Sequence, residues 1–285
     1  MTGLAGLALA LIGMAATRPR ADARPPAAPA TAEHTPLPQL PPPGLVIPAY
    51  KPGPLPFRPG QRLTYRVSWL GIPAAEARVE LHSSREDRDV LTAEAWLETN
   101  RFIDMFFKMR DYMREEMSAA TFETREEYFR QRETRSFNDY FVNFDHDGGV
   151  VTAVRKNRKG EAVKRYIAGN GYGPLSGAIM ALTQPRGPGS VFIFDVFTGD
   201  HRYVLDFKIA SRERIRVPAG DFDAYRIVPG VVYFNDKTMG RELRYTLLWV
   251  SADDRRLPLR AEAGTFIGSL RADLVRVDNP ALASR

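Results

Sequence analysis

The chain has no cysteine among its 285 residues. This absence excludes disulfide bonds, thiolate metal ligands, cysteine nucleophiles and attachment of a lipid to an N-terminal cysteine. The folded part must therefore be held together without covalent cross-links between cysteines, chiefly by packing. A chain of this length can do so, because it buries a sizeable hydrophobic core.

Long hydrophobic runs are also lacking, since the apolar stretch at residues 3–16 has only 14 residues. A helix needs about 20 residues to cross a bilayer. The run instead predicts a secretory signal peptide over residues 1–23, cleaved after Ala23. A retained N-terminal membrane anchor is the alternative, because no cation precedes the run and Arg18 and Arg20 follow it. The main prediction is export to the periplasm.

The sequence has few residues placed for catalysis or metal binding. It contains neither a GxSxG motif nor a phosphate-binding loop with lysine, and the glycine-rich residues 169–177 do not have the Rossmann spacing. Ser176 is expected to lie at the start of a helix. The histidines are His34, His82, His146 and His201. None has metal-ligand spacing, although a site assembled from His146 and His201 remains an alternative. We predict no catalytic residue, no cofactor and no metal.

Positive charge is in slight excess, with a formal net charge of +6. Six cations gather in one predicted hairpin, and these are Arg155, Lys156, Arg158, Lys159, Lys164 and Arg165. This patch could contact an anionic membrane surface or polysaccharide. The alternative is a solvated sheet edge protected by charge. Nucleic acid is not expected, because the hairpin lacks aromatic positions for base stacking.

Proline is concentrated near the N-terminus, where 13 of the 22 prolines lie between Pro25 and Pro59. Such a segment has too little apolar surface to fold and favours extended polyproline II. We therefore predict a disordered, proline-rich linker over residues 24–56, which acts as a tether.

Apolar and polar residues alternate with a period of two beyond the linker. Residues 63–69, 75–81 and 91–97 each place apolar side chains on one face and mostly polar ones on the other. This pattern is typical of half-buried antiparallel strands. Residues 124–135 have helical composition, but we predict a strand because their neighbours alternate.

Two short helices are predicted between the strands. One runs through residues 173–185, between Pro174 and Pro185, and the other through residues 101–109. The fold class is therefore all-β: an antiparallel curved sheet or partly open barrel with one or two short helices. It forms a single domain over residues 57–279, followed by a tail at 280–285.

Asp253 and Asp254, in the stretch SADDRR, could be a carboxylate pair or the tip of a hairpin. A catalytic pair needs two carboxylates that converge across a cleft, about 5–9.5 Å apart in glycosidases. Neighbouring residues in a turn do not converge, and Asp and Ser are common turn residues. We predict a hairpin tip, with Arg255 or Arg256 paired to an aspartate.

Five ordered blocks resemble a known bacterial family, the domain of unknown function 3108. The blocks are residues 57–81, 173–182, 217–229, 247–263 and 266–274. One departure is Glu76, at a position where the family commonly has glycine. The resemblance covers roughly residues 57–277 and implies an exported envelope protein with an antiparallel β-fold, without implying a reaction. Members are similar in architecture to periplasmic lipoprotein carriers, which hold acyl chains in an open β-barrel.

The favoured hypothesis is a non-enzymatic periplasmic protein that binds an apolar or amphipathic envelope component such as lipid. Under this hypothesis one group of side chains lines the interior, and these are Tyr65, Val67, Trp69, Trp96 and Trp249. Residues 101–109, with Phe102 and Phe106, would plug the barrel as a lid or contact lipid or a partner protein. An apolar cavity of about 300 Å³ or more favours this carrier.

Two alternatives remain open at the level of sequence. The first is an assembly or interaction protein of the cell envelope with a filled core. The second is a hydrolase of envelope polysaccharide that uses two separated carboxylates facing a cleft.

Overall fold

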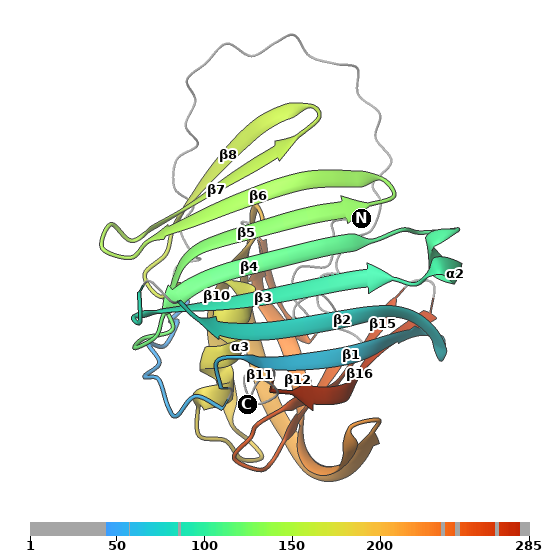
Figure 1. Ribbon diagram of the computed structural model, residues 1–285. Helices are drawn as coiled ribbons and strands as arrows, with labels where there is room; N and C mark the ends of the chain where they lie inside the picture. Colours follow the sequence, from blue (N-terminus) through green and yellow to red (C-terminus); the bar gives the residue numbers. More distant parts are fainter. Residues whose placement is uncertain are drawn as a thin grey trace.

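The strands of the body form one continuous sheet that curves strongly on itself (Figure 1). The computed structural model describes residues 44–56, 58–84, 87–234, 237–242, 246–265 and 268–279. The predicted leader at 1–23, the linker up to residue 43, His34 and the tail at 280–285 lie outside these ranges. None of the helices found within them has the length and apolar character to cross a membrane.

The first half of the sheet contains eight consecutive strands, which turn back and forth along the chain. They are β1 (Gln61–Trp69), β2 (Ile72–Ser83), β3 (Val90–Thr99), β4 (Arg110–Ser118), β5 (Thr124–Glu133), β6 (Ser136–Asp145), β7 (Val150–Asn157) and β8 (Gly160–Ile167). Each strand pairs antiparallel with the next, as the alternating sequence pattern predicts.

The second half contains the remaining eight strands, several of which run behind the first half at a steep angle in Figure 1. They are β9 (Gly171–Tyr172), β10 (Val191–Thr198), β11 (His201–Val217), β12 (Gly220–Phe234), β13 (Lys237–Glu242), β14 (Thr246–Ser251), β15 (Pro258–Thr265) and β16 (Gly268–Asp278). The two halves are joined by antiparallel pairing of β1 with β16. Within the described residues β8 and β9 are the two ends of the strand order, so the sheet is not closed.

The predicted all-β fold is confirmed, including the curved antiparallel sheet and two short helices. These are α2 (Arg101–Asp104) and α3 (Pro174–Thr183). Residues 124–133 form a strand, as predicted, because their buried positions alternate and face the core. Helical propensity is overridden here by pairing with β4 and β6 on both sides.

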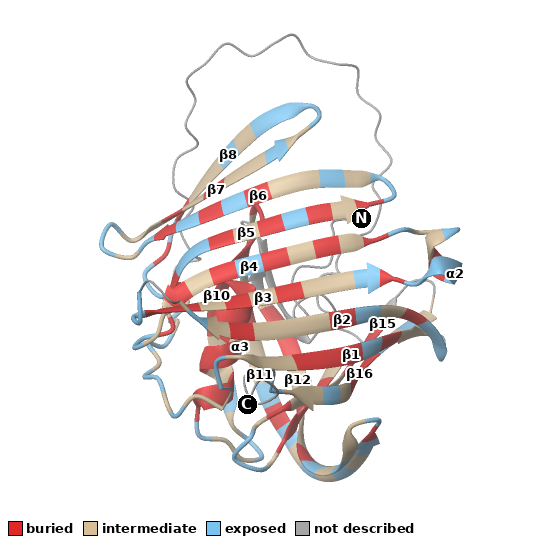
Figure 2. Cartoon of the chain, in the orientation of Figure 1, coloured by how far each residue is buried: buried red, intermediate tan, exposed pale blue. Residues whose placement is uncertain are grey.

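Helix α3 lies inside the curve of the sheet, and most of its residues are buried (Figure 2). A helix that is apolar on nearly all sides is stable only when it is surrounded. Buried side chains from both halves of the sheet pack with Leu175, Ile179 and Met180 in one core cluster. The helix therefore fills part of the interior and leaves the remainder to a cavity.

The end of the predicted linker packs on this body. Tyr50 stacks on Phe194 with ring centroids 4.6 Å apart, and its hydroxyl accepts a hydrogen bond of 2.8 Å from the backbone N–H of Ile193. Leu55 packs against the core cluster. The folded body therefore begins before residue 57, because these two apolar side chains find a place on it.

Asp253 and Asp254 lie at the tip of the hairpin between β14 and β15, as predicted. Asp253 accepts hydrogen bonds from Ser251 Oγ at 2.7 Å and Arg255 Nη2 at 2.6 Å. These charged side chains therefore stabilise the turn of the hairpin.

Candidate functional site

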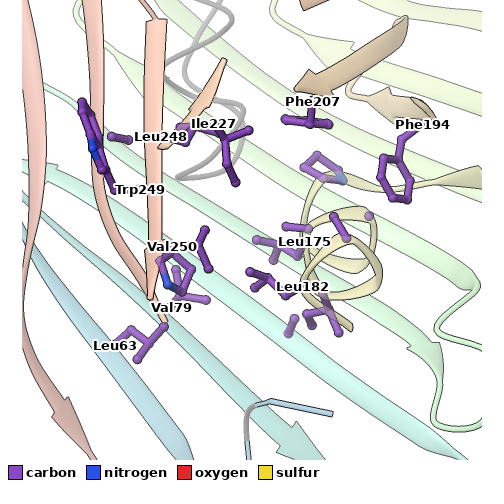
Figure 3. Close-up of a pocket in the computed structure, with 18 of the residues that line it drawn as sticks. Leu63, Val79, Leu175, Leu182, Phe194, Phe207, Ile227, Leu248, Trp249 and Val250 are labelled. Atoms are coloured by element: carbon purple, nitrogen blue, oxygen red, sulfur yellow. The ribbon is translucent and has the colours of Figure 1, made fainter. Parts of the chain in front are cut away.

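An apolar cavity of about 170 Å³, partly open to solvent, lies between α3 and the concave face of both halves of the sheet. Figure 3 shows Leu175 and Leu182 of α3 on the side of the helix that faces Val79 and Val250. Its other large apolar lining residues are Leu63, Tyr65, Leu81, Ile179, Phe192, Phe194, Val196, Phe207, Ile209, Ile227, Leu248 and Trp249. The wall is hydrocarbon because inward-facing strand positions and the helix meet there.

Polar side chains on the cavity wall are few, and most have partners. Tyr65 donates its hydroxyl hydrogen to Pro258 O at 2.9 Å, and Trp249 Nε1 donates to Glu213 Oε1 at 2.6 Å. Glu80 and Arg260 also line the cavity, and each is in an ion pair, with Arg62 and Asp273 respectively. Arg186 is the remaining charged side chain on this wall.

The N-terminus of α3 is held by a buried carboxylate from β4. The backbone N–H groups of Leu175 and Ser176 donate to Glu115 Oε1 at 2.7 Å and Oε2 at 2.9 Å. A carboxylate here satisfies two helix N–H groups and complements the positive end of the helix dipole. Gly173 is needed beside it, since a Cβ there would lie 2.5 Å from Glu115 Oε2. Glu115 therefore fixes the position of α3 above the cavity.

A second buried glutamate lies directly opposite the first. Glu115 on β4 pairs in register with Glu127 on β5, and the two residues are 0% and 2% exposed. Glu127 Oε1 accepts from the N–H of Gly199 at 2.9 Å, while Oε2 is buried without a hydrogen-bond partner in the described structure.

Burial raises the pKa of both glutamates. The pKa of Glu115 rises to about 7, opposed by the two helix N–H groups. The pKa of Glu127 lies well above its usual range, first because of burial and then because of the negative charge on Glu115. Two carboxyl groups this close do not both ionise readily. Neither glutamate lines the cavity, so neither is placed to contact a ligand there, and Glu115 affects the cavity only through the position of α3.

The sequence interpretation missed this pair and a second group of buried acids, Asp111 and Glu133. Burial, and after it the negative charge of the nearby Glu133, raises the pKa of Asp111 to about 8. The sequence does contain a sign of these buried acids. Glu127 and Glu133 lie on the same face of the strand as Phe129, so alternation alone would place their carboxyl groups in the interior. The register that brings Glu115 opposite Glu127 follows from a bulge at Glu116/Met117, which no sequence pattern marks.

The predicted interior residues occupy different places. Tyr65 and Trp249 line the cavity, and Val67 is buried in the same core cluster. Trp69 is half-buried and does not line the cavity. The interior position predicted for Trp96 is wrong, because it lies on the opposite face of β3 from the buried Ala93 and Ala95. There Trp96 contacts the Tyr112 ring and the Arg78 guanidinium.

The predicted lid over residues 101–109 is also wrong. Phe102 and Phe106 are 54% and 71% exposed and contact each other at the rim of the sheet, away from the cavity wall. The segment forms one turn of helix, which Asn100 caps at its N-terminus, and Asp104 of this turn pairs with Arg110 at 2.6 Å. None of the residues 101–109 lines the cavity, so the segment is not a lid over it.

The six cations of the predicted basic patch are divided between the two faces and the tip of the β7–β8 hairpin. Arg155 and Lys164 face Asp200, with ion-pair distances of 3.2 and 3.4 Å. Lys156 pairs with Glu161 at 3.2 Å, and Arg158 lies over the Phe137 ring. Contact of this hairpin with an anionic surface stays a prediction.

Each of the three histidines in the described ranges has a different partner. His82 lies 3.3 Å from Glu80, His146 Nε2 is 2.7 Å from Thr124 O, and His201 is 3.0 Å from Asp200. In the described ranges no group of three or more His, Asp or Glu side chains is arranged to hold a metal ion. Ser176 pairs its hydroxyl with that of Thr124 and not with a histidine.

Comparison with known proteins gives a family match and solved structures that this chain resembles. A family profile described as "Protein of unknown function (DUF3108)" matches residues 64–275. No curated protein matches the chain. A β-barrel-like protein of domain of unknown function DUF1849 from Brucella abortus is similar in structure, with a TM-score of 0.53 and 10% identity over 81% of this chain and 99% of that chain. At this identity the likeness shows the fold alone.

Two further solved structures are similar at lower scores. A candidate exported protein with a YmcC-like fold from Bacteroides fragilis has a TM-score of 0.35 and 9% identity over 80% of this chain and 98% of its own. A candidate lipoprotein from Parabacteroides distasonis has a TM-score of 0.33 and 10% identity over 79% of this chain and 99% of its own.

Proposed function

The chain belongs to the DUF3108 family of proteins of unknown function, and we propose that this member is an exported envelope protein that holds one hydrocarbon chain in the cavity beside α3. The observation that carries the proposal is the cavity itself. Its wall is almost entirely apolar, and it is partly open to solvent. An apolar surface left unfilled inside a packed body is a binding site for apolar groups.

The size of the cavity limits the ligand to a single chain. At about 170 Å³ it falls short of the cavity of about 300 Å³ that the sequence analysis set for a carrier of a whole ligand. An engineered apolar cavity of about 150 Å³ in another protein binds benzene. We therefore infer room for roughly six to eight carbon atoms, which matches the end of one acyl chain.

Binding of neutral 1-alkanols from butanol to dodecanol tests the proposal. Each buried CH₂ contributes about 0.8 kcal/mol, so affinity should rise about fourfold per carbon and then level off near eight carbons. Trp249 reports contact, because it lines the cavity and a brominated alkanol quenches tryptophan fluorescence. Replacing Trp69 and Trp96 by phenylalanine leaves Trp249 as the single indole.

A matched pair of variants locates the binding site. Ala178→Phe places a ring in the cavity and should abolish quenching, whereas Ala210→Phe adds the same ring at an exposed position on β11 that does not line the cavity. Equal quenching in both variants, or no rise of affinity with chain length, would contradict the proposal.

Location in the envelope is supported by the apolar run at residues 3–16 and the small residues up to Ala23. The expected mature protein begins after Ala23 and is released with the periplasmic fraction. Mass spectrometry of the purified native protein checks the cleavage. An intact N-terminus in the membrane fraction would favour the retained anchor instead.

The exposed apolar end of α2 favours a second candidate function, attachment of this rim to an anionic bilayer. Phe102, Met105 and Phe106 are 54%, 69% and 71% exposed. Arg101 and Lys108 are exposed on either side of them. Apolar side chains flanked by cations are typical of segments that enter a membrane interface.

Co-sedimentation with vesicles distinguishes this candidate. Binding to vesicles that contain anionic lipid should fall with Phe106→Ser and be unchanged with Phe141→Ser, which alters a 44% exposed ring on β6. Equal binding by both variants would exclude the rim as the attachment site.

A further inference from the structure

Two guanidinium groups meet at the C-terminal end of α3, beside one end of the cavity. Arg186 Nη2 donates to Ala181 O at 3.0 Å and also to Leu182 O. Arg256 Nη1 donates to the same Leu182 O at 2.8 Å. Because both side chains contact one carbonyl oxygen, they lie side by side. Ala181, Leu182 and Arg186 all line the cavity, so this arginine pair (Arg186 and Arg256) borders its apolar wall.

The positive charge of the arginine pair is not balanced by a carboxylate in the described part of the chain. The hydrogen-bond acceptors of both side chains are backbone carbonyls. Arg186 Nε is buried and has no partner there. The end of a helix supplies only about half a negative charge, which is less than two cations require. Burial, and after it the positive charge of Arg256, lowers the pKa of Arg186 to about 10.

The fold directs Arg256 to this place. It lies at the β14–β15 hairpin tip and has a left-handed backbone with φ of 47°, a conformation that costs a non-glycine residue roughly 1–2 kcal/mol. Its neighbour Arg255 turns the other way and pairs with Asp253. The adjacent arginines of the hairpin therefore differ: one is neutralised at the surface, and the other joins Arg186 at the cavity.

We propose that the arginine pair binds the anionic head group of a single-chain amphiphile, a carboxylate or a phosphate monoester, whose hydrocarbon chain lies in the cavity. The inference rests on the proposed function, because the hydrocarbon chain bound in the cavity is what holds the head group beside the two arginines. Guanidinium groups donate paired hydrogen bonds to carboxylate and phosphate oxygens, and the bond is strongest where water is scarce. An anion would also relieve the repulsion between the two cations and supply an acceptor for Arg186 Nε.

Calorimetric titration of the full chain with four eight-carbon probes tests the inference. The probes are octanoate, octyl phosphate, 1-octanol and octyltrimethylammonium. Octanoate or octyl phosphate should bind at least tenfold more tightly than octanol, and the cationic probe more weakly. The order of the two anions identifies the head group. Arg186→Gln and Arg256→Gln should each reduce binding of the preferred anion at least tenfold and change binding of octanol less than twofold.

Arg255→Gln is the matched control, because it removes a neighbouring arginine that is paired with Asp253 at the surface. It should leave all four affinities unchanged. If octanol binds but neither octanoate nor octyl phosphate binds more tightly than octanol, the arginine pair is not a head-group site and the proposed function stands. If octanol also fails to bind, both are overturned. Should Arg186→Gln fail to fold, Arg256→Gln decides, because its side chain reaches α3 from an exposed hairpin.

Discussion

The buried glutamate pair gives the protein a stability that depends on pH. Both oxygens of Glu115 accept helix N–H groups, which favours its ionised form, whereas Glu127 has one oxygen without a partner. Glu127 therefore keeps the proton at neutral pH. A carboxyl group whose pKa is raised by folding binds more protons in the folded chain than in the unfolded one. Its contribution to stability is complete below the ordinary pKa and declines as pH rises above it.

Glu127→Gln removes this proton and should change the pH dependence of unfolding. Each pH unit in which the folded chain holds one extra proton is worth about 1.4 kcal/mol. Between about pH 5.5 and about pH 7.5 the free energy of unfolding of the variant should therefore gain on the wild type by on the order of 3 kcal/mol. The glutamine oxygen still accepts the hydrogen bond from Gly199. Urea denaturation at both pH values measures the difference.

Glu115→Gln is the contrasting variant. Its amide NH₂ would face one of the two helix N–H groups, leaving a buried donor unpaired at a cost of about 1–3 kcal/mol at every pH. The reasoning is refuted if the two variants lose equal stability, or if Glu127→Gln and the wild type change in parallel with pH.

Two other predictions concern packing around the same core. Arg202→Met leaves Asp195 buried without its two hydrogen bonds of 2.9 and 2.7 Å, so the free energy of unfolding should fall by about 3–5 kcal/mol, as urea denaturation would measure. A loss below about 1 kcal/mol would mean that the ion pair is not desolvated. Gly173→Ala should lower the melting temperature, because its Cβ would collide with Glu115, whereas Gly187→Ala meets nothing within 4 Å and should not.

The sheet could be predicted because apolar and polar residues alternate along most of its strands. Tyr65 and Val67 point inward with Leu63, as a period of two requires. The same rule places Trp96 outward, with Glu94 and Glu98, and the prediction failed there because aromatic character was given more weight than position. The predicted lid failed for a related reason: the apolar residues of 101–109 exceed what one turn of helix buries, and the excess stays exposed.

The site itself depended on contacts between segments far apart in the sequence. Arg186 and Arg256 are brought together by a helix end and a hairpin tip separated by 70 residues, and each segment alone has ordinary turn composition. The position of α3 likewise depends on Glu115, whose role needs both the β4–β5 register and the helix N–H groups. Local sequence patterns predict which segments form strands or helices and which face of each is buried. Contacts between side chains from distant segments depend on how the whole domain packs.

Pairing of β1 with β16 has a consequence for how the molecule forms. Arg62 lies opposite Asp278, so the earliest strand of the sheet must wait for the last one before its edge is covered. Closure of so long a loop makes folding slow, because chain entropy is lost before distant contacts compensate for it. A ribosome-bound chain that still lacks β16 would expose the backbone groups along β1, and such an edge invites aggregation. The sheet can therefore be completed only after the whole chain has left the ribosome. A C-terminal deletion that removes β16 should lower the solubility of the protein even though most of the residues that line the cavity remain.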